Sequence, residues 1–163
     1  MKDLDWSNLG FGYRKTDYNV RCYYRDGKWG EIEVCSSEYV NLHMAATCLH
    51  YGQEAFEGLK AFRCPDGKVR VFRMDENAAR LQSTCRGIMM PEVSTELFEE
   101  MVAKVVRLNQ EYIPTYESGA SLYIRPLLIG TSAQVGVHPA TEYVFLIFVT
   151  PVGPYFKGGF STN

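Results

Sequence analysis

NVRCYYRDGKWGEIEV, residues 19–34, is the stretch that sets the fold class, because two β-rich runs flank the dipeptide Asp26-Gly27. Asp-Gly tolerates the positive φ angles that both central residues of a tight hairpin turn adopt. The pattern therefore predicts a β-hairpin whose strands are residues 19–24 and residues 30–34.

A second hairpin is predicted further along the chain. Residues 58–63 and 68–73 are again β-rich, and Cys64-Pro65-Asp66-Gly67 between them supplies turn-forming residues. We expect a short helix between the two hairpins, near residues 44–49.

Two longer helices are predicted after the second hairpin. Asp75 can cap a helix that runs to about Ile88, and Ser94 can cap the next one, because their side-chain oxygens accept hydrogen bonds from a first helical turn. Pro114 lies just beyond the second helix, where a helix cannot continue. Apolar residues at helical spacing predict its core face: Leu97, Met101, Val105, Leu108 and Tyr112, with Phe98 and Val102 beside it.

Two extended runs, residues 121–129 and 142–151, complete the predicted elements. The order is strands, two helices and strands, without the strict alternation of strand and helix that a parallel sheet requires. We therefore predict an α+β fold, a mainly antiparallel sheet with helices packed on one face. Glycine and proline near residue 153 predict that the domain covers residues 1–152 and that a linker begins at 153–163.

The composition excludes several classes of protein. Seventeen Lys and Arg against 19 Asp and Glu give a net charge of −2, which argues against a nucleic-acid binder and against a polybasic membrane signal. No apolar run approaches the ~20 residues that span a bilayer. The first 11 residues lack a signal-peptide layout, so we expect a cytoplasmic protein. Five scattered cysteines without a Cys-x-x-Cys pair predict neither a disulfide scaffold nor a metal site.

Three further segments contain residues that could perform chemistry. Residues 51–63, YGQEAFEGLKAFR, mix aromatic, small and charged residues, and on composition alone they are a turn that leads into a strand. Arg80 could be a surface residue of a helix with a solvated head group. In SLYIRP, residues 121–126, strand periodicity places Tyr123 and Arg125 on one face and Leu122 and Ile124 on the other.

Together these segments resemble the fold-type IV aminotransferases that use pyridoxal 5'-phosphate, in particular the branched-chain subgroup. The motifs occur in the order and with the spacing of that family, from about residue 11 to residue 159. The resemblance implies that Arg80 binds the cofactor phosphate, to which a guanidinium can donate two parallel hydrogen bonds. It also implies six substrate-binding residues: Phe11, Tyr51, Phe56, Tyr123, Arg125 and Val137.

The resemblance further implies the reaction and the assembly. The expected reaction moves an amino group from leucine, isoleucine or valine to 2-oxoglutarate, so the partners are amino acids and 2-oxo acids. Gly136-Val137 resembles a loop that in this family reaches the active site of the partner subunit, and we expect a homodimer. The lysine that forms a Schiff base with the cofactor is expected beyond Asn163, because none of the seven lysines has the surrounding sequence of the family's lysine.

We therefore expect that residues 1–152 are an amino-terminal small domain, that residues 1–163 contain no catalytic residue because the lysine belongs to a carboxy-terminal domain beyond them, and that this fragment cannot transaminate alone. Two alternatives stay open. One is another fold-type IV enzyme, such as a D-amino acid aminotransferase or an aminodeoxychorismate lyase, although the Leu-Tyr-Ile-Arg-Pro string disfavours both. The other is a non-catalytic domain for dimerisation or ligand binding.

Overall fold

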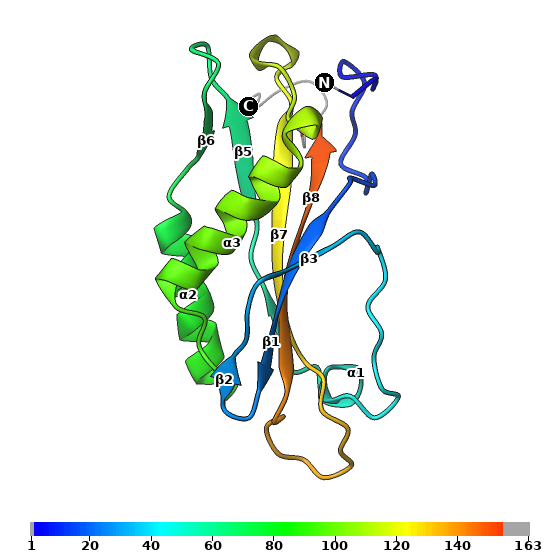
Figure 1. Ribbon diagram of the computed structural model, residues 1–163, viewed down its shortest axis with the longest axis vertical. Helices are drawn as coiled ribbons and strands as arrows, with labels where there is room; N and C mark the ends of the chain where they lie inside the picture. The colour runs from blue at the N-terminus through cyan, green and yellow to red at the C-terminus, as the bar shows by residue number, and fades with distance from the viewer. Residues whose placement is uncertain (1, 155–163) are drawn as a thin grey trace, which may run out of the picture.

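The computed structural model describes residues 2–154. Eight strands form one sheet in the order β2-β1-β8-β7-β5-β6, with β3 paired to β1 and β4 paired to β7, and every pairing is antiparallel. Helices α2 and α3 cross the same face of the sheet (Figure 1), so the predicted α+β fold is confirmed.

The strands are β1 (Asn19–Arg25), β2 (Lys28–Trp29), β3 (Glu33–Cys35), β4 (Glu54–Phe56), β5 (Leu59–Arg63), β6 (Val69–Val71), β7 (Ser121–Gly130) and β8 (Tyr143–Val152). The helices are α1 (Thr47–Tyr51), α2 (Met74–Gly87) and α3 (Thr95–Leu108), with short 3-10 turns at Gln110–Tyr112 and Tyr116–Ser118.

The first hairpin has the predicted turn. Asp26 and Gly27 have φ angles of 52° and 76°, as the tight turn requires. The second arm is not the continuous strand predicted over residues 30–34. The register slips by one residue, so that two residues of β1 face the three residues 30–32 in a β-bulge that separates β2 from β3.

The long strands β7 and β8 pair over ten residues each and form the centre of the sheet. Strand periodicity turns every second side chain toward the helices, where the core excludes water. Its fully buried residues include Leu122, Ile124 and Leu128 from β7, Phe145 and Ile147 from β8, Leu81 from α2, and Phe98, Met101 and Val105 from α3.

The start of α3 agrees with the prediction from the sequence, and the start of α2 differs from it. The Ser94 hydroxyl accepts a hydrogen bond from the Leu97 backbone N–H at 3.1 Å, so the predicted cap of α3 is confirmed. The predicted cap at Asp75 is wrong, because α2 already begins at Met74, and the residue in the cap position is Arg73, with a φ of 50°. Asp75 lies instead in the first turn, where its charge faces the positive helix end. The buried face of α3 comprises Phe98, Met101, Val102, Val105 and Val106, whereas Leu97 and Leu108 lie at its margins.

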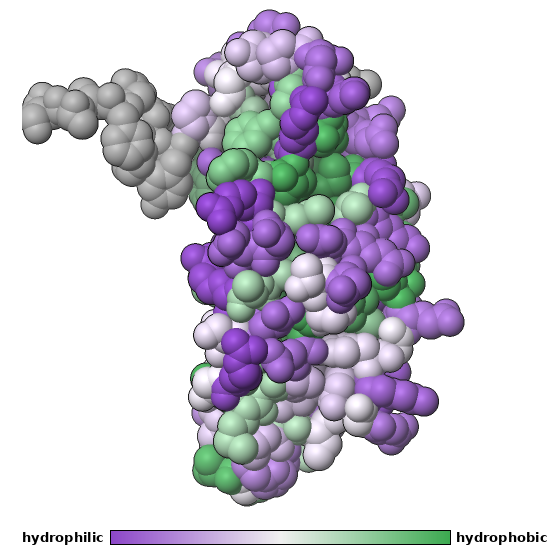
Figure 2. All heavy atoms as spheres, turned by 90° about the vertical axis from the view of Figure 1, so that its left-hand side faces the viewer, coloured by the Kyte–Doolittle hydropathy of each residue, from purple (hydrophilic) through white to green (hydrophobic). Residues whose placement is uncertain are grey.

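The surface on the side of α2 and β6 is a mosaic of polar residues with apolar patches between them (Figure 2). Among the described residues, no helix has the length and apolar character needed to cross a membrane.

Most of the predicted linker, residues 155–163, lies outside the described part of the chain. The domain boundary at residue 152 therefore stays a prediction. The Schiff-base lysine is expected beyond Asn163, outside the 163 residues of this sequence, and its position stays a prediction.

Candidate functional site

The candidate site lies on the face of the sheet opposite the helices, where β7 presents Tyr123 and Arg125. The Tyr123 hydroxyl accepts hydrogen bonds from Arg125 Nε at 3.1 Å and from Arg125 Nη2 at 2.8 Å. Leu122 and Ile124 are fully buried on the helix side. The predicted division of this strand into two faces is therefore confirmed, and the phenol fixes one edge of the guanidinium.

Two phenylalanine rings flank this pair. The Phe56 ring lies with its centroid 4.5 Å from Arg125 Cζ, and the Phe11 ring meets the Tyr123 ring edge to face at 5.3 Å. Phe56 is 61% exposed and Phe11 is 43% exposed, so both rings also face solvent. Phe11, Phe56, Tyr123 and Arg125 are called the aromatic–guanidinium cluster below. A cation beside apolar rings suits a small molecule that has a carboxylate and an apolar side chain.

Gly58 allows Tyr123 to approach the backbone that connects β4 to β5. A Cβ atom at Gly58 would lie 2.7 Å from the Tyr123 hydroxyl, closer than atoms in contact can approach. The hydroxyl can therefore occupy its place only next to a glycine. Sequence reasoning did not assign this role to Gly58, although its position in the Phe-Glu-Gly step was a usable signal.

Arg80 of α2 is paired with a buried carboxylate. Arg80 Nε lies 2.9 Å from Glu57 Oε1, and Arg80 Nη2 lies 2.5 Å from Glu57 Oε2. Asn77 Nδ2 also donates to Glu57 Oε2, at 3.0 Å. The Glu57 carboxylate raises the pKa of Arg80, which stays charged. Sequence reasoning missed Glu57 because no local pattern predicts an ion pair between residues 23 positions apart.

Glu57 joins this ion pair to the cluster through the chain. It follows Phe56 and precedes Gly58, and its backbone N–H donates to the Pro126 carbonyl beside Arg125 at 3.0 Å. The structure thus brings four of the predicted substrate residues together and connects Arg80 to them through Glu57.

Tyr51 and Val137 form a second group at the Gly130 end of β7. The Tyr51 hydroxyl donates to the Val135 carbonyl, and the Tyr51 and Val137 side chains both line a depression of about 340 Å³. Val137 is 85% exposed. No member of the aromatic–guanidinium cluster lines this depression. The structure therefore separates the six predicted substrate residues into two groups within one chain.

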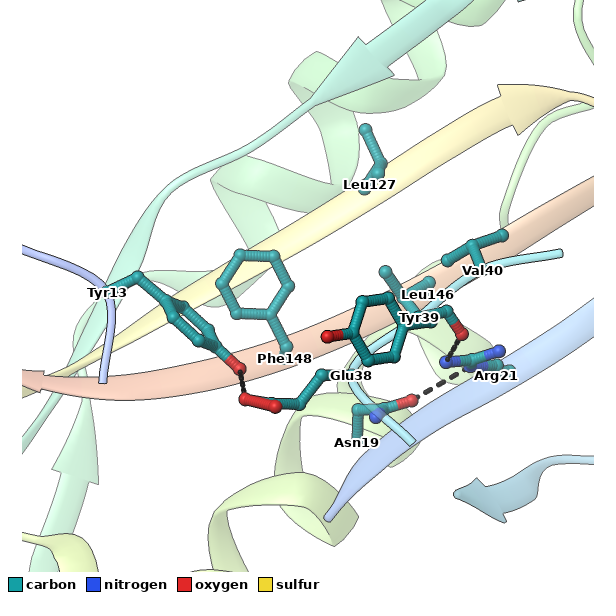
Figure 3. Close-up of a pocket in the computed structure, with 9 residues that line it drawn as sticks. All are labelled: Tyr13, Asn19, Arg21, Glu38, Tyr39, Val40, Leu127, Leu146 and Phe148. Carbon is teal, nitrogen blue, oxygen red and sulfur yellow. Dashed lines mark hydrogen bonds between the residues drawn. The ribbon is translucent and has the colours of Figure 1, made fainter. Parts of the chain in front are cut away.

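A larger cavity of about 450 Å³ lies on the same face of the sheet (Figure 3). Its floor includes Leu127, Leu146 and Phe148, and Phe148 is the cross-strand partner of Arg125. Arg21 is 8% exposed and donates to the carbonyls of Ser37 and Tyr39, which holds residues 37–40 at the rim. The volume is typical of small-molecule sites. No sequence pattern indicates this cavity, because its lining comes from strands and loops far apart in the chain.

The Tyr13 phenol closes one end of the cavity. It donates to Glu38 Oε1 at 2.9 Å, and its ring meets Phe148 edge to face at 6.0 Å. Burial of the hydroxyl and the nearby Glu38 carboxylate raise the pKa of Tyr13 to about 12, so it remains a neutral donor near neutral pH. The described residues contain no group of three or more His, Cys, Asp or Glu side chains placed to hold a metal ion.

Comparison with known proteins shows which proteins this chain resembles. No protein-family model matches it. Over all 163 residues it is 50% identical to a branched-chain-amino-acid aminotransferase of Haemophilus influenzae, of which it covers 48%. A branched-chain-amino-acid aminotransferase of Helicobacter pylori is 49% identical over 98% of the chain, which covers 47% of that relative. Over 98% or more of its length the chain is therefore similar to branched-chain aminotransferases. It spans about half the length of the curated relatives it matches.

The fold of this chain agrees with that of a solved structure. The crystal structure of the Escherichia coli branched-chain amino acid aminotransferase matches it with a TM-score of 0.66 and 29% identity, over 88% of this chain and 42% of that one. The resemblance inferred from the sequence motifs is therefore confirmed. The roles of the individual site residues stay predictions.

Proposed function

We propose that the protein containing this chain is a pyridoxal-phosphate-dependent branched-chain aminotransferase that transfers the amino group of leucine, isoleucine or valine to 2-oxoglutarate. The observation that carries the proposal is the aromatic–guanidinium cluster, in which Arg125 is oriented by Tyr123 and packed on Phe56. The names of relatives that match 98% or more of this chain support the same reaction.

In this proposal the cluster orients the substrate. Arg125 uses its Nε and Nη2 edge for Tyr123, so the edge that includes Nη1 is turned away from that contact and can bind a carboxylate. Phe11 and Phe56 offer apolar surface, and burial of an aliphatic side chain there contributes roughly 1.5–3 kcal/mol. One methylene changes such binding by only about 1–3 kcal/mol, so the same site should accept all three amino acids.

The residues present fit the cofactor. Pyridoxal phosphate supplies the electron sink that permits bond breaking at the amino acid α-carbon. Arg80 is 68% exposed and keeps a permanent positive charge, which suits a phosphate. We further propose that the lysine that binds the cofactor lies beyond Asn163. Tyr51 and Val137 complete the substrate site across a homodimer, which would explain their separation from the cluster. We expect this enzyme in the cytoplasm.

The direct test is a substrate profile of the full-length protein. We expect turnover of leucine, isoleucine and valine with 2-oxoglutarate, measured by coupled glutamate detection, and negligible turnover of D-alanine. Turnover of D-alanine without leucine would reject the proposal in favour of a D-amino acid aminotransferase. Absence of all transamination by cofactor-loaded protein would favour a non-catalytic domain.

Phe56 provides a test of the pocket within the full-length enzyme. We expect Phe56→Ala to raise the KM for leucine about tenfold with a smaller change in kcat, because the variant loses apolar contact worth roughly 1.5–3 kcal/mol. Phe72→Ala is the matched control, since Phe72 is 78% exposed and lies outside the cluster. An unchanged KM in Phe56→Ala would remove Phe56 from the substrate site.

A further inference from the structure

Glu57 is a carboxylate in an unusual position for a charged side chain. It is only 3% exposed, although ionised residues are seldom buried without partners. Its partners are Arg80 and Asn77, both on α2, and the contacts occupy both carboxylate oxygens. The cost of burying this charge is therefore offset by hydrogen bonds from a guanidinium and an amide.

The contact uses one particular edge of Arg80. A guanidinium has five N–H donors arranged on two usable edges, one that includes Nε and one formed by the two terminal nitrogens. Glu57 engages Nε and Nη2, which is the first edge. The Arg80 side chain is 68% exposed, so its terminal edge, with Nη1, remains accessible to a second anion.

Two effects of Glu57 on anion binding at Arg80 oppose each other. The carboxylate partly neutralises the guanidinium, which weakens its attraction for an anion. It also fixes the rotatable side chain, which removes the entropy cost of ordering an arginine on binding. Because the Glu57 carboxylate is buried on one edge of the guanidinium while the Arg80 side chain is 68% exposed, an anion can still bind the other edge, and the orienting effect should dominate.

The neighbours of Glu57 in the chain determine where the oriented guanidinium is held. Phe56 contacts Arg125, and Gly58 permits the close approach of Tyr123. Asn77 also donates to the Gly58 carbonyl at 3.3 Å, so the ion pair and the Phe56–Gly58 backbone are tied to the same turn of α2. This connection, together with the core packing of α2, holds Arg80 at a fixed separation from the aromatic–guanidinium cluster.

We propose that Glu57 is a positioning residue that holds Arg80 by one edge of its guanidinium and presents the other edge to the phosphate of the cofactor. The inference rests on the proposed function. In this proposal the ion pair orients Arg80 toward the phosphate, and residues 56–58 connect Arg80 to the cluster that binds the substrate carboxylate.

The test measures binding of two probes to the full-length apoenzyme. Pyridoxal phosphate and pyridoxal differ in the phosphate, so the ratio of their dissociation constants isolates its contribution. We expect Glu57→Gln to weaken pyridoxal phosphate binding about tenfold, the scale of a lost hydrogen bond to a charged group, and to leave pyridoxal binding within about twofold of wild type. Glu54→Gln, an exposed position three residues earlier in the chain, is the matched control and should change neither constant.

Arg80 variants separate this inference from the proposed function. Arg80→Gln should abolish most of the preference for the phosphorylated probe, and the Glu57→Gln, Arg80→Gln double variant should be no worse than Arg80→Gln alone. If Arg80→Gln loses the preference and Glu57→Gln keeps or increases it, the positioning role is wrong and the proposed function stands. If the wild-type protein shows no preference for pyridoxal phosphate, the proposed cofactor site itself is wrong.

Folding of the variants is checked by thermal melting, since Glu57 is buried. If Glu57→Gln does not fold, Glu57→Asp answers the same question, because it keeps the charge but shortens the reach to Arg80. A purely structural role would weaken binding of both probes equally, and that result in either variant would overturn the proposal.

Discussion

The Tyr123 hydroxyl fits in its position only because residue 58 is a glycine and has no Cβ atom. The residues of the site therefore constrain one another closely. The hydroxyl both orients Arg125 and occupies the space beside Gly58. Tyr123, in turn, is packed against Phe11. Substitutions at these residues should therefore have non-additive effects, whereas substitutions at independent surface residues should be additive.

Gly58→Ala tests this constraint in the full-length enzyme. The new Cβ would lie 2.7 Å from the Tyr123 hydroxyl, so the phenol must move and Arg125 loses its partner. We expect the KM for leucine to rise about tenfold, as for loss of one hydrogen bond to a charged group. Gly87→Ala is the matched control, because a Cβ added there would meet nothing within 4 Å and KM should not change. Equal KM values for the two variants would contradict the role of Gly58.

Residues of the site differ in how far the sequence predicts them. The shared face of Tyr123 and Arg125 follows from the two-residue period of a strand, and it was predicted. The contact between Glu57 and Arg80 depends on the packing of α2 against the β4–β5 corner, which no local period encodes. The separation of Tyr51 from Arg125 likewise depends on where β7 ends, and the motifs alone do not reveal it.

At the scale of the elements, the residues at the helix ends determine where each helix begins. Ser94 satisfies an otherwise unpaired backbone N–H at the start of α3, and α3 supplies most of the helical core. This cap was predictable because a serine hydroxyl at the N-cap readily accepts a hydrogen bond from a backbone N–H of the first turn. The prediction failed at α2 because the αL conformation of Arg73 ends the preceding strand segment and starts the helix early, and arginine is not a residue that signals φ > 0.

Ser94→Ala should destabilise the domain by about 1 kcal/mol, the usual cost of removing an N-cap side chain. Ser83→Ala is the control, because Ser83 is exposed within α2 and alanine is the better helix former there. Urea unfolding followed by circular dichroism measures both. A Ser94→Ala midpoint at or above that of Ser83→Ala would show that the cap contributes nothing.

Across the whole molecule, Asn109 connects segments that are far apart in the sequence. Its Oδ1 accepts from the backbone N–H groups of Asp17 and Tyr18, and its Nδ2 donates to the carbonyls of Tyr18 and Val105. It is 1% exposed, so none of these groups can turn to water instead. Asn109 therefore anchors the segment before β1 to the end of α3.

Asn109→Ala should lower the free energy of unfolding by roughly 1–3 kcal/mol for each polar group left buried without a partner. Gln110→Ala, the exposed neighbour, is the control and should change stability by less than about 0.5 kcal/mol. Denaturant unfolding provides the comparison, and similar midpoints for the two variants would contradict the anchoring role.

The stability of the molecule should also depend on alkaline pH through Cys85. Burial raises the pKa of this thiol from 9.0 to about 11. Between these pH values the unfolded chain releases a proton that the folded chain retains, so the free energy of unfolding falls as pH rises. Unfolding curves from pH 8 to pH 11 should fall less steeply for Cys85→Ala than for wild type. Parallel curves would show that Cys85 does not contribute.

The central place of β8 has a consequence for how the chain is made. β8 lies between β1 and β7, and Arg14 at the amino-terminal side bonds to Thr150, 136 residues further on. A ribosome adds roughly 5–20 residues each second, so β1 emerges on the order of ten seconds before its partner does. During that interval β1 has only its short hairpin partners, and its exposed edge is a target for wrong pairing. The sheet should therefore close only once β8 has left the ribosome, and nascent-chain chaperones that shield extended segments should matter most between the appearance of β1 and that of β8.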